Sequence, residues 1–132
     1  MEKRITLIRV PKPHSSDVNV ELQWLGNSLG LFNERDKDKS CFRIFITLIK
    51  AAKHERPLSS DQIAEHLNLS RGTVVHHMNK LLSSGLVLRD RQGYILRINK
   101  MDSLIGEIQR DMERMCSDLR KVAQELDGWL GL

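Results

Sequence analysis

The sequence lacks most of the features that mark membrane, secreted and metal-rich proteins. Its two cysteines, Cys41 and Cys116, are too few for a disulfide framework or a cysteine metal knot. The longest apolar run, over residues 44–49, is interrupted by a threonine and is far too short to cross a bilayer. Charges and prolines break the apolar part of the amino-terminal stretch, which argues against a secretory signal. These absences favour a small protein of the reducing cytoplasm, with no membrane partner.

What the chain does contain is suited to one packed domain. Hydrophobic residues make up 40% of its 132 residues and charged residues 29%, whereas three prolines and eight glycines are too few for a low-complexity segment. The charge is uneven, because residues 39–100 contain eleven Lys and Arg against four Asp and Glu, a net charge of +7. Residues 1–38 are neutral, and residues 101–132 carry −3. A basic centre favours a polyanion as its partner, with ordinary surface charge as the alternative.

The first part of the chain carries the weakest signals. β-branched residues predict a strand over residues 5–10, ended by two prolines. Asp17 is expected to cap a short helix, because apolar residues follow it at helical spacing as far as Leu29. Residues 33–39 are expected to form a charged loop. Residues 1–38 are therefore an amino-terminal extension to which the sequence assigns no role.

The next segment predicts a buried helix. Over residues 41–52, apolar side chains recur at i, i+3, i+4, i+7 and i+11, so one face of the helix must be covered. Asp38 or Ser40 is placed to cap it. Leu58 is expected to lie in a very short strand after the helix ends.

Two short helices and a hairpin follow. A capping box over residues 59–62 starts the first helix, and Ser70 caps the second, which ends at Gly85 in a left-handed conformation. Residues 86–98 then alternate at period two about a turn that contains Gly93, which predicts a β-hairpin. The order helix, short strand, helix, turn, helix and hairpin is that of a winged helix-turn-helix, a mainly α fold with a small β-hairpin wing.

Residues 101–132 contain an unbroken heptad repeat. Apolar side chains follow steps of four and three residues, which is typical of a coiled coil and predicts one long helix that pairs with a second copy of the chain. The predicted dimer interface consists of Met101, Ile105, Ile108, Met112, Met115, Leu119, Val122, Leu126 and Trp129. Residues such as Cys116 at the e positions widen the stripe on one side. The acidic g positions Asp111, Asp118 and Glu125 form a surface that phosphate would repel.

The centre of the chain resembles a known family of regulators. Residues 63–78 read IAEHLNLSRGTVVHHM, and they are followed by Leu81 and by Gly-Leu-Val over residues 85–87. This pattern is similar to that of winged-helix regulators of the ArsR type, with Met78 where the family usually has leucine. The resemblance covers about residues 40–100, and it implies a winged-helix fold and transcription regulation through DNA.

The second short helix is the candidate reader of DNA. Its apolar residues Val74, Met78 and Leu81 are expected to face the domain, and the resemblance implies the same for His77. On the outward face, Arg suits guanine, Asn suits adenine, and valine can touch a thymine methyl group, whereas the hydroxyls and the lysine suit phosphate. The predicted contacts are Ser70, Arg71, Gly72, Thr73, Val75, His76, Asn79 and Lys80. An ordinary solvated helix face is the alternative.

The hairpin is the expected wing. Arg89, Arg91 and Gln92 lie at or near its turn, where they are placed to reach a neighbouring minor groove or its phosphates. A polar turn is also what any exposed hairpin has, so both interpretations stay open.

Metal sensing and catalysis find little support. Relatives that bind metals use cysteines on the helix before the reader, or His and carboxylates on the last helix. Here residues 59–67 contain no cysteine and residues 101–132 no histidine, and Cys41 lies on an apolar face typical of the core. No phosphate-binding glycine loop, metalloprotease helix or nucleophile elbow is present. We therefore expect no metal, no cofactor and no enzyme activity.

Together these features predict a sequence-specific regulator of transcription that binds double-stranded DNA. Residues 39–100 would form the DNA-binding domain, and residues 101–132 a coiled-coil-like dimerisation helix. Such a homodimer would recognise a pseudo-palindromic site. The alternative is a winged helix that serves as a protein-interaction module in a larger assembly. The sequence does not reveal an effector ligand.

Overall fold

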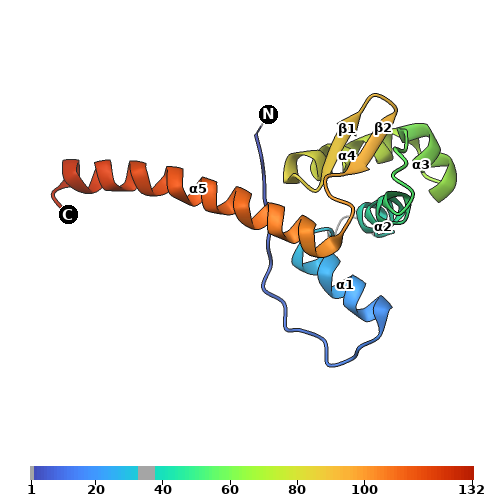
Figure 1. The fold of residues 1–132 in the computed structure, drawn as a ribbon, viewed down its shortest axis with the longest axis horizontal. Coiled ribbons are helices and arrows are strands. Elements are labelled where there is room, and N and C mark those ends of the chain that lie inside the picture. Colours follow the sequence, from blue (N-terminus) through green and yellow to red (C-terminus); the bar gives the residue numbers. More distant parts are fainter. Residues whose placement is uncertain (1, 33–37) are drawn as a thin grey trace. The chain divides into compact units, whose positions relative to one another are not determined.

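The computed structural model describes residues 2–32 and 38–132. Within these residues it contains five helices and one two-stranded antiparallel sheet (Figure 1). The elements are α1 (Val18–Ser28), α2 (Ser40–Ala52), α3 (Ser60–Leu67), α4 (Arg71–Ser84), β1 (Val87–Asp90), β2 (Gly93–Leu96) and α5 (Met101–Leu130). The chain divides into two units, residues 1–99 and residues 100–132. Among the described helices, none is long and apolar enough to span a membrane.

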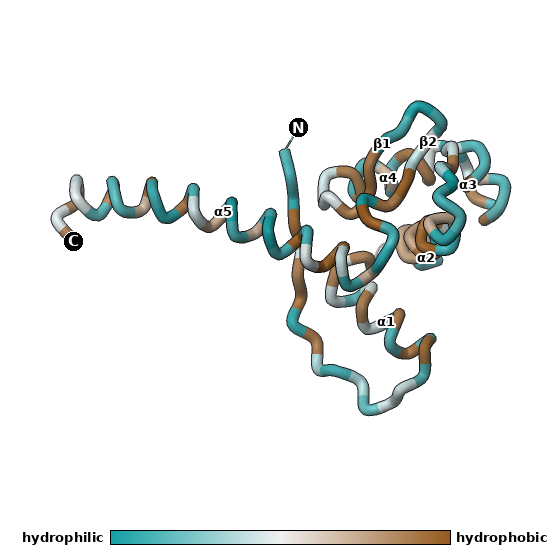
Figure 2. The backbone as a smooth tube through the Cα atoms, viewed as in Figure 1, coloured by the Kyte–Doolittle hydropathy of each residue, from teal (hydrophilic) through white to brown (hydrophobic). Residues whose placement is uncertain are grey.

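The first unit contains the predicted winged helix-turn-helix. Helices α2, α3 and α4 are followed by the hairpin β1–β2, and α2 packs against α3, α4 and β2 (Figure 1). Figure 2 shows that hydrophobic residues dominate α2, the helix at the centre of these contacts. The core side chains of this domain are at most 5% exposed: Ile44, Phe45, Leu48, Ile63, Val74, Met78, Leu81, Leu86, Val87, Tyr94 and Leu96. Their removal from water is the main term that stabilises the domain.

Local hydrogen bonds fix the ends of α3 and α4. The Gln62 N–H donates to Ser59 Oγ over 3.1 Å, and the Ser59 N–H donates to Gln62 Oε1 over 2.9 Å, which confirms the capping box. Ser70 Oγ accepts from the Thr73 N–H at 3.1 Å and caps α4. Gly85 ends α4 with a φ of 81°, as predicted.

The start of α2 differs from the prediction. Neither Asp38 nor Ser40 caps the helix: Lys39 occupies the cap position with a φ of 55°, and no side chain makes a cap hydrogen bond. Ser40 is already the first helical residue and is 3% exposed, so it lies within the helix. Residues 33–37 of the predicted charged loop lie outside the described residues.

The hairpin is joined by the very short strand predicted at Leu58, which is a single bridging residue. Leu58 and Tyr94 exchange two backbone hydrogen bonds, with N–O distances of 3.0 Å and 2.7 Å. A Cβ atom on Gly93 would lie 2.2 Å from the Leu58 carbonyl oxygen. Glycine is therefore required at position 93, because the backbone at Leu58 approaches closely and because the residue follows the turn.

The predicted strand over residues 5–10 is wrong. This segment is extended but pairs with no strand among the described residues. Instead, the Arg4 N–H donates to the Ser83 carbonyl and the Ile8 N–H to the Ser28 carbonyl, both over 2.8 Å. The last carbonyls of a helix lack partners within the helix, so the ends of α4 and α1 supply the acceptors that a sheet would have supplied.

Helix α1 forms as predicted and packs tightly on the domain. Asp17 caps it by accepting from the N–H groups of the second and third helical residues. A Cβ atom on Gly26 would lie 2.6 Å from the Phe42 ring, and the Phe42 and Phe32 rings stack with centroids 4.8 Å apart. A glycine inside a helix usually lowers its stability, but at position 26 the missing side chain allows this close contact.

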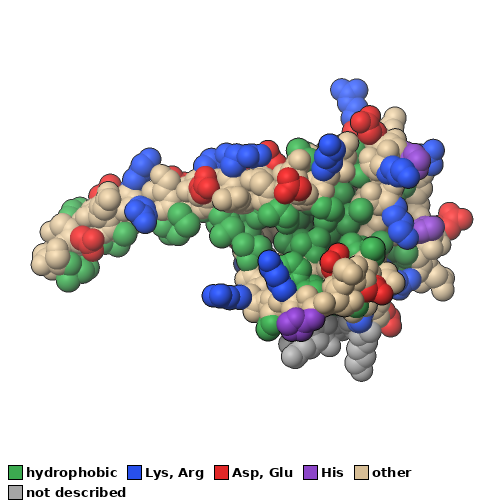
Figure 3. All heavy atoms as spheres, turned by 60° about the horizontal axis from the view of Figure 1, so that its bottom comes forward, with side chains coloured by type: hydrophobic (Ala, Val, Ile, Leu, Met, Phe, Trp, Pro, Cys, Tyr) green, Lys and Arg blue, Asp and Glu red, His purple; other side chains and the backbone are tan. Residues whose placement is uncertain are grey.

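The second unit is dominated by α5, a helix of 30 residues that ends at Gly131 with a φ of 71°. Figure 2 shows hydrophilic and hydrophobic residues alternating along it, as expected for an amphipathic helix. Beyond Asp111 every residue of the helix is exposed, and Figure 3 shows hydrophobic side chains at intervals towards its carboxyl end. The apolar heptad positions beyond Asp111 range from 36% exposed at Met112 to 89% at Trp129.

The buried positions of α5 do not follow the predicted seam. The buried residues of α5 are Leu104, Ile108 and Asp111. Of these three, Ile108 alone belongs to the predicted dimer interface, and the neighbouring interface residue Ile105 is 38% exposed. Asp111, expected on an acidic surface, is 3% exposed and forms an ion pair with Arg114, one turn further on. Two of these three buried residues, Leu104 and Asp111, occupy g positions beside the predicted seam.

Candidate nucleic-acid interface

The face of α4 opposite the core is exposed where the prediction expects a DNA contact. Val74, Met78 and Leu81 are 0% exposed, which fixes the rotation of the helix. Because an α-helix has 3.6 residues per turn, the side chains on the opposite side of α4 form an outward face. On that outward face Arg71, Gly72, His76, Asn79 and Lys80 are exposed, and Thr73 and Val75 are half-buried. His77, which the resemblance places towards the domain, lies beside the buried stripe and is half-buried.

The amino-terminal turn of α4 is capped by hydrogen bonds and exposed. Ser70 and Thr73 share a hydrogen bond of 2.8 Å between their hydroxyl oxygens, in addition to the cap. A Cβ atom on Gly72 would have no heavy atom within 4 Å, so the protein's own packing does not require glycine there. The backbone of this turn is thus accessible to a large partner, and its N–H groups lie at the positive end of the helix dipole.

Arg71 is paired on the surface. Its Nε atom lies 3.5 Å from a carboxylate oxygen of Asp61 on α3, and both side chains are about three-quarters exposed, at 74% and 76%. An exposed pair of this kind contributes little to stability, so exchanging the carboxylate for a phosphate or a guanine edge costs little.

Lys80 faces a different neighbour from the one predicted. Its Nζ atom donates to the Gly30 carbonyl over 2.8 Å, which draws the ammonium towards the amino-terminal segment. A phosphate contact by Lys80 stays a prediction that requires the ammonium to share its other donors or to leave this bond. The neighbouring His76 contacts His77 edge to face, with ring centroids 5.3 Å apart.

The wing presents polar side chains at its turn. Arg91 and Gln92 are exposed between the two strands, and the Gln92 N–H donates to the Asp90 carboxylate over 3.2 Å. Arg89 lies on β1, where its guanidinium carbon is 5.5 Å from the centroid of the Tyr94 ring. This cation–π contact holds Arg89 over the face of the hairpin, so Arg91 is the arginine at the tip.

The comparison with protein families agrees with this geometry. A family model described as a helix-turn-helix domain matches residues 38–90, which include α2, α3, α4 and β1. Residues 38–90 form a helix-turn-helix domain. Neither the curated proteins nor the solved structures gave a significant match. Helix-turn-helix domains are DNA-binding domains of regulators and are typically not enzymes, so DNA is the partner class that the match supports.

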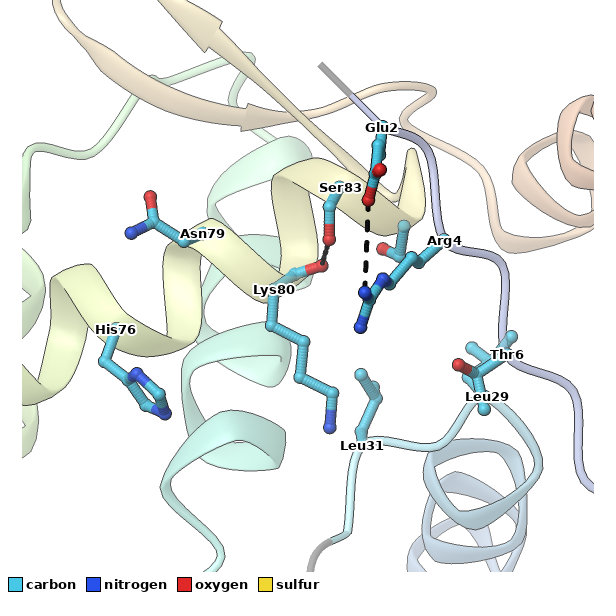
Figure 4. Close-up of a pocket in the computed structure, with 10 residues that line it drawn as sticks. Glu2, Arg4, Thr6, Leu29, Leu31, His76, Asn79, Lys80 and Ser83 are labelled. Carbon is cyan, nitrogen blue, oxygen red and sulfur yellow. Dashed lines mark hydrogen bonds and ion pairs between the residues drawn. The ribbon is translucent and has the colours of Figure 1, made fainter.

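One feature of the first unit is not predicted by any sequence pattern. A hollow of about 640 Å³ lies between the amino-terminal segment, the end of α1 and the carboxyl-terminal half of α4 (Figure 4). Its lining consists of Glu2, Arg4, Thr6, Leu29, Leu31, His76, Asn79, Lys80, Ser83 and Ser84. No local motif predicts this site, because it depends on how an extended segment folds back onto a distant helix.

A second hollow, of about 470 Å³, lies between α2 and α3. Four of its lining residues are basic or imidazole side chains, from Lys50, His54, Arg56 and His66. These groups belong to the basic centre seen in the sequence. Among the described residues, no group of three or more His, Cys, Asp or Glu is arranged to hold a metal ion. Cys41 is 2% exposed, in keeping with its expected place in the core.

Proposed function

We propose that the protein is a transcription regulator of the ArsR type that binds a specific sequence in double-stranded DNA. The observation that carries the proposal is the outward face of α4, whose first two turns expose polar side chains and unobstructed backbone within a helix-turn-helix domain. The amino-terminal residues of such a helix are the ones that reach base edges in the major groove.

Within this proposal, the side chains of α4 have different roles. Arg71 reads guanine, Asn79 and His76 contact neighbouring base edges, and Val75 touches a thymine methyl group. Gly72 lets the helix backbone approach the duplex. The hydroxyls of Ser70 and Thr73 lie at the end of the helix that attracts phosphate, although both also take part in the cap.

The wing extends the contact beyond the major groove. Arg91 and Gln92 at the hairpin tip approach a neighbouring minor groove or its phosphates, and Arg89 adds charge from β1. These contacts position the protein and add to affinity for most sequences, whereas α4 supplies the specificity.

The protein acts as a homodimer through α5. The exposed apolar stripe from Met112 to Trp129 repeats every seven residues, which suits a second helix of the same kind. A two-fold dimer presents two copies of α4, so it binds two half-sites about 10 base pairs apart, or a multiple of that, in a pseudo-palindrome.

The test is selection of binding sites from random duplex, followed by gel-shift titration of the selected site at two salt concentrations. The triple variant Arg71→Ala, His76→Ala and Asn79→Ala is expected to lose most specific affinity, at about 1–3 kcal/mol for each lost base contact. Its fold should stay intact, because these three side chains are exposed. The matched control is Lys12→Ala, which removes an exposed cation outside α4 and the wing.

Two results would contradict the proposal. Equal binding of the selected site by the triple variant and the parent protein would remove α4 from the role of reader. Failure to enrich any sequence, at both salt concentrations, would favour the alternative of a winged helix that contacts another protein.

A further inference from the structure

The hollow beside α4 is lined mainly by charged and polar side chains. The Arg4 guanidinium and the Lys80 side chain extend into it from opposite walls, and Leu31 lies beneath them (Figure 4). Leu29 and Leu31 are at most 5% exposed, so both belong to the core beneath the hollow and present little surface to it. At about 640 Å³, the space is within the range of sites that hold small molecules.

Backbone and side-chain contacts hold the walls in place. The Arg4 N–H donates to the Ser83 carbonyl, and Lys80 donates to the Gly30 carbonyl, each over 2.8 Å. Gly30 has a φ of 70°, and a Cβ atom there would lie 2.6 Å from the Thr6 methyl group. These contacts join the amino-terminal segment to α4 without filling the space between them.

One acidic side chain shares the hollow. The Glu2 carboxylate lies 3.9 Å from the Arg4 guanidinium, and both side chains are highly exposed, at 89% and 80%. Such a pair is weak and is readily exchanged for another anion. Glu2 therefore marks where a negative group is attracted, and it competes with any anion that enters.

We propose that this hollow binds a small organic anion that carries a carboxylate or phosphate group. The anionic group pairs with Arg4 and Lys80, and the rest of the molecule lies along the walls that include His76 and Asn79. The hydroxyls of Thr6, Ser83 and Ser84 line the same space and offer further hydrogen bonds.

The second part of the inference is that the anion weakens DNA binding, and this part rests on the proposed function. His76 and Asn79 line the hollow and also belong to the proposed reading face. A ligand against them restricts their side chains and places negative charge beside a surface that must approach phosphate. By linkage, DNA weakens anion binding by the same factor.

Binding is tested first without DNA, by recording amide NMR spectra of the full chain with benzoate, phenyl phosphate and the neutral benzyl alcohol. Both anions should shift resonances of residues 4–6, 29–31 and 79–84, with dissociation constants on the order of millimolar for such small probes. The carboxylate and phosphate arms also show which acid group is preferred. No shift with either anion, or equal shifts with benzyl alcohol, would overturn the proposed site.

Two variants should change the affinity in opposite directions. Arg4→Gln removes a charged partner and should weaken binding of the preferred anion about fivefold or more. Glu2→Gln removes the internal competitor and should strengthen it by a smaller factor. Lys12→Gln is the control, because it removes an exposed cation that does not line this hollow. A loss of affinity in Lys12→Gln as large as the loss in Arg4→Gln would reduce the site to general charge attraction and contradict the proposal.

The coupling is then measured by titrating the selected duplex with and without saturating anion. The parent protein should lose DNA affinity in the anion, whereas Arg4→Gln should bind DNA normally and respond less. Unchanged DNA affinity in a protein that binds both partners would overturn the coupling but leave the proposed function intact. If no duplex is bound specifically, the proposed function and the coupling both fail, and the NMR result alone decides the anion site.

Discussion

Helices α4 and α5 have the same helical period but use their apolar residues differently. In α4 the apolar stripe is 0% exposed at Val74, Met78 and Leu81, and the exposed face is polar. In α5 the apolar residues beyond Asp111 are themselves exposed, as far as 89% at Trp129. The pattern in α4 is that of a helix whose apolar face is covered within its own domain. The pattern in α5 is that of a helix whose apolar face is available to bind another surface.

The largest expected effect follows from placing charge in the stripe of α5. Replacing Met115 and Leu119 together by Asp would bury charges at the centre of a paired helix, which an apolar interface tolerates poorly. The double variant should sediment as a monomer and lose most affinity for a two-half-site duplex, while it keeps weak half-site binding. A parent protein that is already monomeric at micromolar concentration would contradict the dimer.

The next effect separates the two helices by stability. Met78→Ala removes a fully buried side chain from the core of the helix-turn-helix domain and should cost about 2–5 kcal/mol of unfolding free energy. Leu119→Ala on α5 removes a side chain that is 68% exposed in the single chain. Below the concentration at which dimers form, denaturant titration should detect little change for Leu119→Ala. Similar losses for both variants would show that α5 is already covered within one chain.

A smaller effect tests whether the exposed face of α4 is functional. Gly72→Ala meets no obstacle in the free protein, and it should stabilise the helix by up to about 1 kcal/mol. The added methyl group stands where the backbone is proposed to approach DNA, so affinity for the selected site should fall. Thermal unfolding and gel-shift titration measure the two quantities independently. A rise in stability with unchanged DNA affinity would place Gly72 outside the contact.

The smallest effect concerns the wing. Replacing Arg89 and Arg91 by Gln should lower affinity for most sequences and flatten its salt dependence by about one slope unit for each lost phosphate contact. Arg91→Gln alone should account for most of the change, because Arg89 is held over the Tyr94 ring. An unchanged salt slope would remove the wing from the DNA.

The sequence predicted the parts of the fold that local hydrogen bonds and periodicity determine. The capping box at Ser59, the cap at Ser70 and the left-handed Gly85 are short-range features, and they are confirmed. The strand over residues 5–10 was wrong because β-branched composition cannot tell whether a partner strand exists. The N–H groups of this region donate to carbonyls at the ends of helices instead. Which carbonyls are within reach depends on tertiary packing.

The candidate site likewise has one part that the sequence predicts and another that depends on tertiary packing. The outward face of α4 follows from period 3.6 once its apolar stripe is recognised, and the burial pattern agrees with it. The contact between Lys80 and Gly30 joins residues that are 50 apart in the chain, and the hollow beside it likewise depends on distant segments. Neither has a local signal. The buried Leu104 and Asp111 were missed because a heptad count considers one stripe only.

The most direct test of the account is the stoichiometry of the complex with a selected duplex, measured by sedimentation velocity at micromolar concentration. The account predicts two protomers on each duplex for the parent protein, and no such complex for the triple variant Arg71→Ala, His76→Ala and Asn79→Ala. A complex of one protomer per duplex would contradict the dimer, and an unaltered complex with the triple variant would contradict the role of α4.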